Sequence, residues 1–436
     1  MPGGFSHPRH RPISSHDFDL HFHGMHGLLN LALGAALTAV SALLLVPVAV
    51  FFLQVFAARL PRREAHAPQI KDSAVTSADC GASLTRLAVL VPAHDEAAGI
   101  FATLSSIRPQ LKPTDRLLVV ADNCTDATAD IARCCGAEVI ERQQADLRGK
   151  GYALDFGLKH LASDPPQVLV VVDADCTLDE GCLRYLAEAC VRSGRPVQAL
   201  YLMNAPTEAP LRLRLAAFTW RIKNWLRPLG ALRLGVPCPL MGAGMAFPWQ
   251  LISQANLASG HLVEDMKLGI DLAREGHPPL FVPEARVDSV FPLSNDAAQA
   301  QRSRWEHGHL STLVSDGPSL LWGAVSARDA RLTLMALDLM VPPLTLLLAL
   351  VLLDFLLGSV LASAVGTWPM GIALTCLILV LAASLRAWWV VGRDLLSVGD
   401  LLRAPAHLVM KVPMYLKFVS RRQKEWVRTE RHDDKL

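Results

Sequence analysis

Three long apolar blocks stand out along the chain, separated by a region in which apolar runs are short. Residues 28–60 are uncharged until Arg59, and residues 336–362 and 368–391 form two further blocks joined by the small-residue segment 363–367. Each block is long enough to cross a bilayer as a helix, and these lengths disfavour buried helices of a soluble domain. The later blocks are interrupted by charged residues that we expect to face protein or water: Asp338, Asp354 and Arg386. We therefore predict one transmembrane helix near the N-terminus and two near the C-terminus.

Between the first two blocks, short apolar runs alternate with segments of helical spacing. Strands are predicted at 86–92, 116–121, 138–141 and 168–177, and helices at 96–107, 127–135 and 150–161. This alternation indicates βαβ units in a mostly parallel sheet with helices on both faces. Farther on, the looser pattern predicts a strand at 196–202, a glycine-rich turn entering a strand at 240–249, and helical stretches at 210–226, 263–274 and 297–321. No G-x-G-x-x-G follows the first strand, which disfavours an NAD-binding domain.

These patterns divide the chain into seven segments. We expect a disordered leader, a transmembrane helix, a linker, an α/β domain, an interfacial helix, a pair of transmembrane helices and an amphipathic tail, at residues 1–26, 27–60, 61–83, 84–310, 311–332, 333–392 and 393–436. Arginines follow the first span and basic residues fill the tail, whereas residues 358–370 carry no charge. The positive-inside rule then places the α/β domain in the cytoplasm, on an integral protein of the inner or plasma membrane.

Composition supports a membrane protein and excludes a disulfide framework. Of the 436 residues, 51% are hydrophobic, and the mean hydropathy of +0.30 is high for a soluble enzyme. The nine cysteines include no C-x-x-C pair, which indicates reduced thiols and no zinc site.

The stretch 168–177, VLVVVDADCT, contains the clearest chemical signal. Five apolar residues lead directly into Asp173 and Asp175. A buried parallel strand that ends in two carboxylates places them where open α/β sheets bind ligands. Two neighbouring carboxylates repel each other unless a hard cation such as Mg²⁺ or Mn²⁺ lies between them. Taken alone, the pair is equally well explained by a strand followed by a helix-capping aspartate.

Further acidic and aromatic signals follow in a fixed order between the predicted spans. They are Asp95-Glu96, Asp122, Asp173-Ala174-Asp175, Val263-Glu264-Asp265 and Gln301-Arg302-Ser303-Arg304-Trp305. This series resembles the D, D-x-D, [TE]-E-D, Q-x-x-R-W motifs of the membrane-bound glycosyltransferases of family 2, the group that contains cellulose, chitin, hyaluronan and poly-N-acetylglucosamine synthases. The likeness covers about residues 84–310, with a looser match beyond. Val263 departs from the usual threonine, whereas the carboxylate that ends the motif is kept.

The resemblance implies a GT-A-like fold, and charge and geometry suggest a role for each motif. Asp175, with Asp173, is the expected metal ligand, and the nucleotide sugar is expected to meet Glu96, Asp122, Lys150, Asp173 and Arg304. Asp265 is the expected general base of an inverting transfer, with Glu264 orienting it. Gln301 and Trp305 are assigned to the acceptor side, where Trp305 offers a flat apolar surface for a sugar ring. Gly242 and Gly244 join them because their turn resembles the acceptor-side loop of the family. Lys150 also fits a solvated basic loop, and Gly242-Ala243-Gly244 also fits a plain tight turn.

The predicted function is transfer of a sugar from a UDP-sugar to a growing polysaccharide or a lipid-linked acceptor. Q-x-x-R-W favours exopolysaccharide assembly, but single-addition enzymes resembling ceramide glucosyltransferase carry it too, and three spans are few for a sugar channel. A homo-oligomer or an export partner could complete such a channel, and no nucleic-acid partner is expected. A catalytically silent scaffold and a nucleotidyltransferase are the alternatives, and neither explains the full set of motifs.

Overall fold

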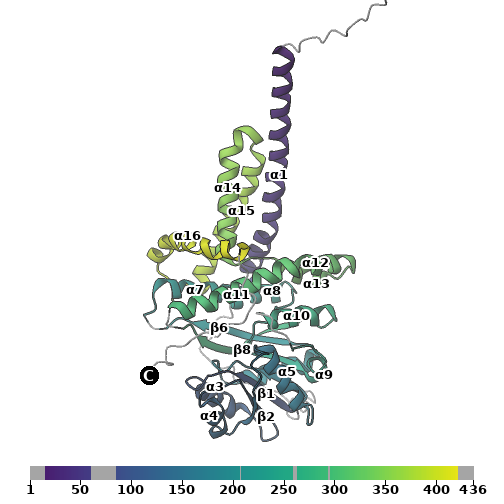
Figure 1. Ribbon diagram of the computed structural model, residues 1–436, viewed down its shortest axis with the longest axis vertical. Helices are drawn as coiled ribbons and strands as arrows, with labels where there is room; N and C mark the ends of the chain where they lie inside the picture. The colour runs from purple at the N-terminus through teal and green to yellow at the C-terminus, as the bar shows by residue number, and fades with distance from the viewer. Residues whose placement is uncertain (1–14, 60–84, 207, 259–262, 293–294, 421–436) are drawn as a thin grey trace, which may run out of the picture.

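The computed structural model describes residues 15–59, 85–206, 208–258, 263–292 and 295–420. Most of the expected leader, the linker and the end of the tail therefore lie outside the described residues. Within the described residues, an α/β domain lies at one end and a bundle of long helices projects from it (Figure 1). A layer of further helices, α7, α8, α11, α12, α13 and α16, lies between the two.

The domain is built on one eight-stranded sheet. Its strands are β1 Leu87–Ala93, β2 Arg116–Asp122, β3 Glu138–Arg142, β4 Val168–Val171, β5 Thr177–Leu178, β6 Val197–Asn204, β7 Met245–Pro248 and β8 Leu280–Val290, in the order β3-β2-β1-β4-β7-β6-β8-β5. The β3-β2-β1-β4 half is parallel throughout, and β6 pairs with β8 in parallel. β7 is antiparallel to both neighbours, and β5 is antiparallel to β8. The sheet is therefore mixed, with its predicted parallel part intact.

Helices cover both faces of this sheet and form the layer beneath the bundle. They are α3 Ile100–Ile107, α4 Thr128–Cys134, α5 Lys150–Leu161, α6 Cys182–Ser193, α7 Leu211–Arg221, the π-helical turn η2 Ile222–Leu226, α8 Arg227–Arg233, α9 Trp249–Ile252, α10 Glu264–Arg274, α11 Asn295–Ser315, α12 Gly317–Ser326, α13 Ala330–Leu339 and α16 Val398–Ser420. The predicted helix at 150–161 has the bounds observed for α5. Gly136 ends α4 in the left-handed conformation, with φ of +73°, as glycine permits.

The strand expected at 168–177 is divided into β4 and β5, and β5 pairs with β8. Among the elements that were not foreseen are α6, α9 and β8. β8 pairs with β6 in two registers, Ala199 opposite Val282 and then Leu200 opposite Arg286. Three residues of β8 are thus bulged out, and they include Pro283. A bulge breaks the alternation of apolar and polar positions by which a strand is recognised in a sequence.

Three helices are long and apolar enough to cross a membrane. They are residues Leu28–Ala57 of α1 (Ser15–Ala57), α14 Leu344–Val365 and α15 Trp368–Val391. α1 begins inside the segment expected to be a disordered leader. No proline lies between Pro12 and Pro47 to interrupt a helix there, and Pro47 itself lies within α1. α14 begins at Leu344 rather than near residue 336, because Pro342 and Pro343 separate it from α13.

Buried polar contacts join the helical bundle to the domain. Arg227 of α8 donates hydrogen bonds to Gln54 Oε1 of α1 (2.8 Å) and to Asp338 Oδ1 of α13 (2.7 Å), and Gln54 Nε2 donates to the same Asp338 oxygen (2.6 Å). Arg386 of α15 donates to the backbone oxygens of Val55 and Ala58 at the end of α1. Both Asp338 and Arg386 thus face protein, as we expected of charged residues within apolar blocks.

Gly230 is where α8 packs most closely on α1. A Cβ at this position would lie 1.8 Å from the backbone oxygen of Gln54. We expect Gly230→Ala to force the two helices apart and to lower the free energy of unfolding by about 1–3 kcal/mol or more. Gly323 of α12 is the matched control, because its Cβ would meet nothing within 4 Å. Thermal unfolding of both detergent-solubilised variants tests this, and equal stability would contradict the close packing.

Candidate active site

A cavity of about 670 Å³ opens where the carboxyl ends of β1, β2 and β4 face α10 and α11. Nearly all of the predicted site residues line it: Glu96, Asp122, Lys150, Asp173, Asp175, Gly242, Glu264, Asp265, Gln301, Arg304 and Trp305. Gly244 does not, because its Cβ position points at Ala199 and Val287 in the core. The structure thus brings together residues that are up to 209 positions apart, from Glu96 to Trp305.

Asp173 and Asp175 come from the turn that follows β4. One carboxylate oxygen of each and the Cys176 sulfur all lie within 4.8 Å of one another. Ser289 Oγ donates to Asp175 Oδ2 at 3.3 Å. Burial raises the pKa of the Cys176 thiol well above its usual value, so the available donors are the two carboxylates. An all-oxygen donor set of this kind suits Mg²⁺ or Mn²⁺.

Lys150, the first residue of α5, lies at the centre of the acidic residues. Its ammonium group forms an ion pair with Asp173 and donates to the backbone oxygen of Gly242 at 2.8 Å. Burial by itself lowers the pKa of Lys150, but the Asp173, Glu264 and Asp265 carboxylates together raise it above its ordinary value. The lysine is therefore a fixed positive charge, and not the solvated basic loop considered from the sequence.

Glu264 and Asp265 form the first turn of α10, where the helix dipole favours negative charge. Burial raises the pKa of both, and that of Glu264 reaches about 7. Lys150 opposes this shift at both residues. Gly242, with φ of +97°, has its Cβ position 3.3 Å from Asp265 Oδ2 and 3.8 Å from Asp173 Oδ2. The Asp265 carboxylate of α10 and the Asp173 carboxylate after β4 therefore both lie close to one backbone position.

Asp122, at the end of β2, has a structural partner that the sequence did not reveal. Arg142 of β3 donates to Asp122 Oδ1 at 2.6 Å, and both side chains are less than 10% exposed. Burial raises the pKa of Asp122 even though Arg142 lowers it. Glu96 lies nearby, and its backbone NH donates to Thr128 Oγ1.

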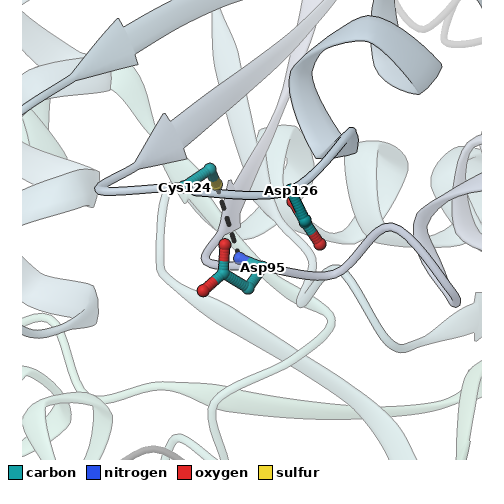
Figure 2. A group of neighbouring side chains, drawn as sticks. All are labelled: Asp95, Cys124 and Asp126. Atoms are coloured by element: carbon teal, nitrogen blue, oxygen red, sulfur yellow. Dashed lines mark hydrogen bonds between the residues drawn. The ribbon is translucent and has the colours of Figure 1, made fainter. Parts of the chain in front are cut away.

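The loops after β1 and β2 are tied together beside these residues. Figure 2 shows Asp95, Cys124 and Asp126, with the Asp95 NH directed at the Cys124 sulfur, 3.4 Å away. Asp95 accepts from the Thr125 NH, and Asp126 accepts from the NH groups of Ala97 and Thr128. Burial raises the pKa of Cys124 to about 11, so this sulfur is a thiol at neutral pH. The cluster therefore shapes the rim of the cavity through hydrogen bonds to backbone.

The Q-x-x-R-W residues enter the cavity from α11. Burial lowers the pKa of Arg304, and three acidic residues across the cavity, Glu264, Asp173 and Asp175, oppose that shift. Gln301 is 6% exposed, and its Oε1 has no hydrogen-bond partner within the described ranges. Trp305 packs on Trp220 of α7 with ring centroids 4.8 Å apart.

Sequence reasoning missed several lining residues on α7, η2, α8 and α13. They are Trp220, Lys223, Arg227 and Asp338. A helix was expected over 210–226, but nothing in its spacing indicated which face would meet the motifs. Asp338 was assigned to a membrane span, and its pairing with Arg227 depends on a contact across 111 residues.

Residues 85–308 match the family model "Glycosyltransferase like family 2", and the chain belongs to this family. Its mixed sheet with helices on both faces, together with the three apolar helices, makes it a GT-A-like member with membrane segments. The probable glycosyltransferase YdaM of Bacillus subtilis (strain 168) is 27% identical over 238 residues, 52% of this chain and 56% of that protein. The hexosyltransferase Agl6 of Haloferax volcanii, from low-salt glycan biosynthesis, is 34% identical over 110 residues, 25% of each chain. The chain thus spans about half of the first relative's length and a quarter of the second's.

Solved structures of similar proteins include two glycosyl-transferring enzymes. The mannosyltransferase PcManGT from Pyrobaculum calidifontis, in complex with GDP-Man and Mn²⁺, is 17% identical, with coverage of 88% of this chain and 95% of that chain and a TM-score of 0.47. Glucosyl-3-phosphoglycerate synthase from Mycobacterium tuberculosis, in complex with Mg²⁺ and UDP, is 23% identical, with coverage of 53% and 82% and a TM-score of 0.35.

The buried Arg142–Asp122 pair gives a stability prediction. We expect Arg142→Met to lower the free energy of unfolding by about 3–5 kcal/mol at neutral pH, because Asp122 is left as an uncompensated buried charge. The native pKa of Asp122 is raised, so protonation stabilises the variant and the loss shrinks as the pH falls towards that pKa. Denaturant unfolding at several pH values measures both effects.

The matched control for this pair is Arg86→Met. Arg86 pairs with Asp164 at 2.8 Å, but these side chains are 39% and 60% exposed. We expect it to cost about 0–1 kcal/mol. A similar loss in both variants would contradict a special role for the buried pair.

Proposed function

We propose that the protein is an inverting, metal-dependent glycosyltransferase that transfers a sugar from a UDP-sugar to an acceptor at the membrane. The observation that carries this proposal is the convergence of Asp173 and Asp265 on Gly242. One cavity of about 670 Å³ is thus lined by the Asp173 and Asp175 carboxylates on the donor side and by the separate carboxylate of Asp265. Membership of glycosyltransferase family 2 supports the same reaction class.

The donor side neutralises the leaving group. Asp175 and Asp173 would hold Mg²⁺ or Mn²⁺, which supplies positive charge against the diphosphate as the glycosidic bond breaks. Glycosyltransferases of similar fold have been crystallised with Mn²⁺ or Mg²⁺ and a nucleotide or nucleotide sugar. Arg304 adds a guanidinium that can bind phosphate oxygens bidentately. Lys150 holds Asp173 in place, and Glu96 and Asp122 lie on the side where the nucleoside would bind.

Asp265 is the proposed base. In an inverting transfer the acceptor hydroxyl attacks the anomeric carbon opposite the leaving group, and one carboxylate takes its proton. Burial makes Asp265 more basic than an exposed aspartate, whereas Lys150 and Lys223 keep it from being protonated too readily. Glu264 would orient this base from the preceding position.

The acceptor would enter on the side of the membrane helices, past Gln301, Trp305 and Gly242. Trp305 offers an apolar ring face against which a sugar can stack. The acceptor is a growing polysaccharide or a lipid-linked molecule, in a cytoplasmic active site of an exopolysaccharide pathway. A second copy of the chain or an export partner would be needed to move a polymer across the membrane.

The assignment of the base predicts the behaviour of Asp265→Asn. We expect the rate of sugar transfer to fall by about 10²–10⁴-fold, because the amide cannot accept the proton. UDP binding should remain measurable, since the metal and phosphate contacts are unchanged. Radiolabelled UDP-sugars and full-length protein in native membranes provide the assay.

Asp271→Asn is the matched control for this variant, because Asp271 lies on the same helix and pairs with Lys267 away from the cavity. It should transfer sugar at the wild-type rate. Wild-type activity in Asp265→Asn would remove Asp265 from the mechanism.

The metal assignment makes a separate prediction for Asp175→Ala. We expect its affinity for UDP in the presence of Mn²⁺ to equal that of the wild type in EDTA, because the metal contribution is lost. Asp179→Ala, four residues farther on at an exposed position, should retain metal-dependent binding. Isothermal titration with UDP distinguishes these results, and unchanged affinity in Asp175→Ala would rule out its role.

A further inference from the structure

A second, smaller cavity of about 100 Å³ adjoins the active site on the side of the membrane helices. Both cavities are lined by the same five residues, Trp220, Lys223, Arg227, Trp305 and His309. The second cavity also reaches apolar residues of the bundle, Phe51 of α1 and Leu344 and Leu347 of α14. It therefore links the reaction centre with the ends of two membrane helices.

The charges in this second cavity are unbalanced. Four cationic side chains line it, Lys223, Arg227, Arg302 and Lys411. Arg227 pairs with Asp338 (2.7 Å) and Lys411 with Glu306 (2.8 Å). In the part of the chain that the structure describes, Lys223 and Arg302 form no salt bridge, and Lys223 has only the ring of Trp220 beneath it at 5.5 Å. Burial lowers the pKa of both cations, and the nearby Glu306 carboxylate, which is already paired with Lys411, opposes this shift without cancelling it.

In the part of the chain that the structure describes, the interior of the bundle of α1, α14 and α15 is closely packed. It is filled by buried side chains from each of them, among them Val55, Val351 and Val380. Tight contacts continue towards the far end, where a Cβ at Gly34 would lie 2.9 Å from the Val365 oxygen. An acceptor that reaches the second cavity from the bilayer therefore has to arrive beside the helices, as a lipid does.

We propose that the acceptor is an anionic, phosphate-bearing membrane lipid whose phosphate binds between Lys223 and Arg302. This inference rests on the proposed transferase function and specifies its acceptor. The acyl or prenyl chain would leave past Phe51 and Leu344. Arg302 lines only the second cavity and Asp265 only the first, so the phosphate lies beside the reacting carbon and not at it.

A hydroxyl on the same lipid is then the nucleophile. Its oxygen forms a bond to the anomeric carbon, the bond from that carbon to the diphosphate oxygen breaks, and the hydroxyl proton passes to Asp265. The products are a glycosylated anionic lipid and UDP. No oxidant or further reactant is needed.

The test uses membranes that contain the full-length protein, a panel of radiolabelled UDP-sugars, and the variant Arg302→Gln. We expect the label in the chloroform–methanol extract, on a product that an anion-exchange resin retains. Arg302→Gln should reduce this labelling by about ten-fold or more, because it removes a charged hydrogen-bond donor to the phosphate. Its UDP binding in Mn²⁺ and its slow hydrolysis of the donor by water should stay at wild-type levels.

Arg393→Gln is the matched control. Arg393 lies just beyond the C-terminal end of α15, stacks on Trp389 and lines neither cavity. It should label lipid at the wild-type rate. Label in a neutral glycolipid or in a polymer, or full activity in Arg302→Gln, would overturn the lipid proposal and leave the transferase intact. Absence of both transfer and donor hydrolysis in the wild type would instead contradict the transferase function itself.

Discussion

The site depends on one partly buried lysine, Lys150, that is surrounded by carboxylates. Asp173, Glu264 and Asp265 come from two elements about ninety residues apart, and like charges at close range repel one another. Lys150 offsets this repulsion at the point where they meet, and its hydrogen bond to the Gly242 oxygen fixes the backbone between them. Without that cation, burial would favour neutral acids, which neither hold a metal nor accept a proton.

Polar side chains that satisfy one another also join the catalytic domain to the membrane helices. Arg227, Gln54 and Asp338 satisfy one another where α8, α1 and α13 meet, so the wall of the active site cannot shift without disturbing the first span. Gly230 allows the close approach that this contact needs. The first of the apolar helices therefore supports the active-site wall from behind, through Gln54.

The sequence allowed prediction of those elements whose residue pattern is complete within a short segment. The parallel strands, α5 and the ordered acidic motifs were predicted because each depends on a short run of residues. The proximity of Asp122 to Asp173 followed from the rule that parallel strands of a sheet end at one edge. β8 was missed because its bulge breaks the alternation, and α14 was extended too far because two prolines were read as part of an apolar block. The Asp122–Arg142 pair and the roles of Lys223 and Asp338 depend on contacts between distant segments, which no local pattern encodes.

Trp305 and Trp220 line both cavities, and the charged side chains differ between the two. On one side, Lys150 and Arg304 lie among a larger number of carboxylates around the position of the donor. On the other side, Lys223 and Arg302 are partly buried and form no salt bridge within the described residues, although Glu306 lies near both. Removing a cation from water is costly unless an anion offsets the loss. A site of this kind is completed by its ligand. Under the proposal of an anionic lipid acceptor, these two cations, and not the catalytic motifs that the family shares, would select the acceptor.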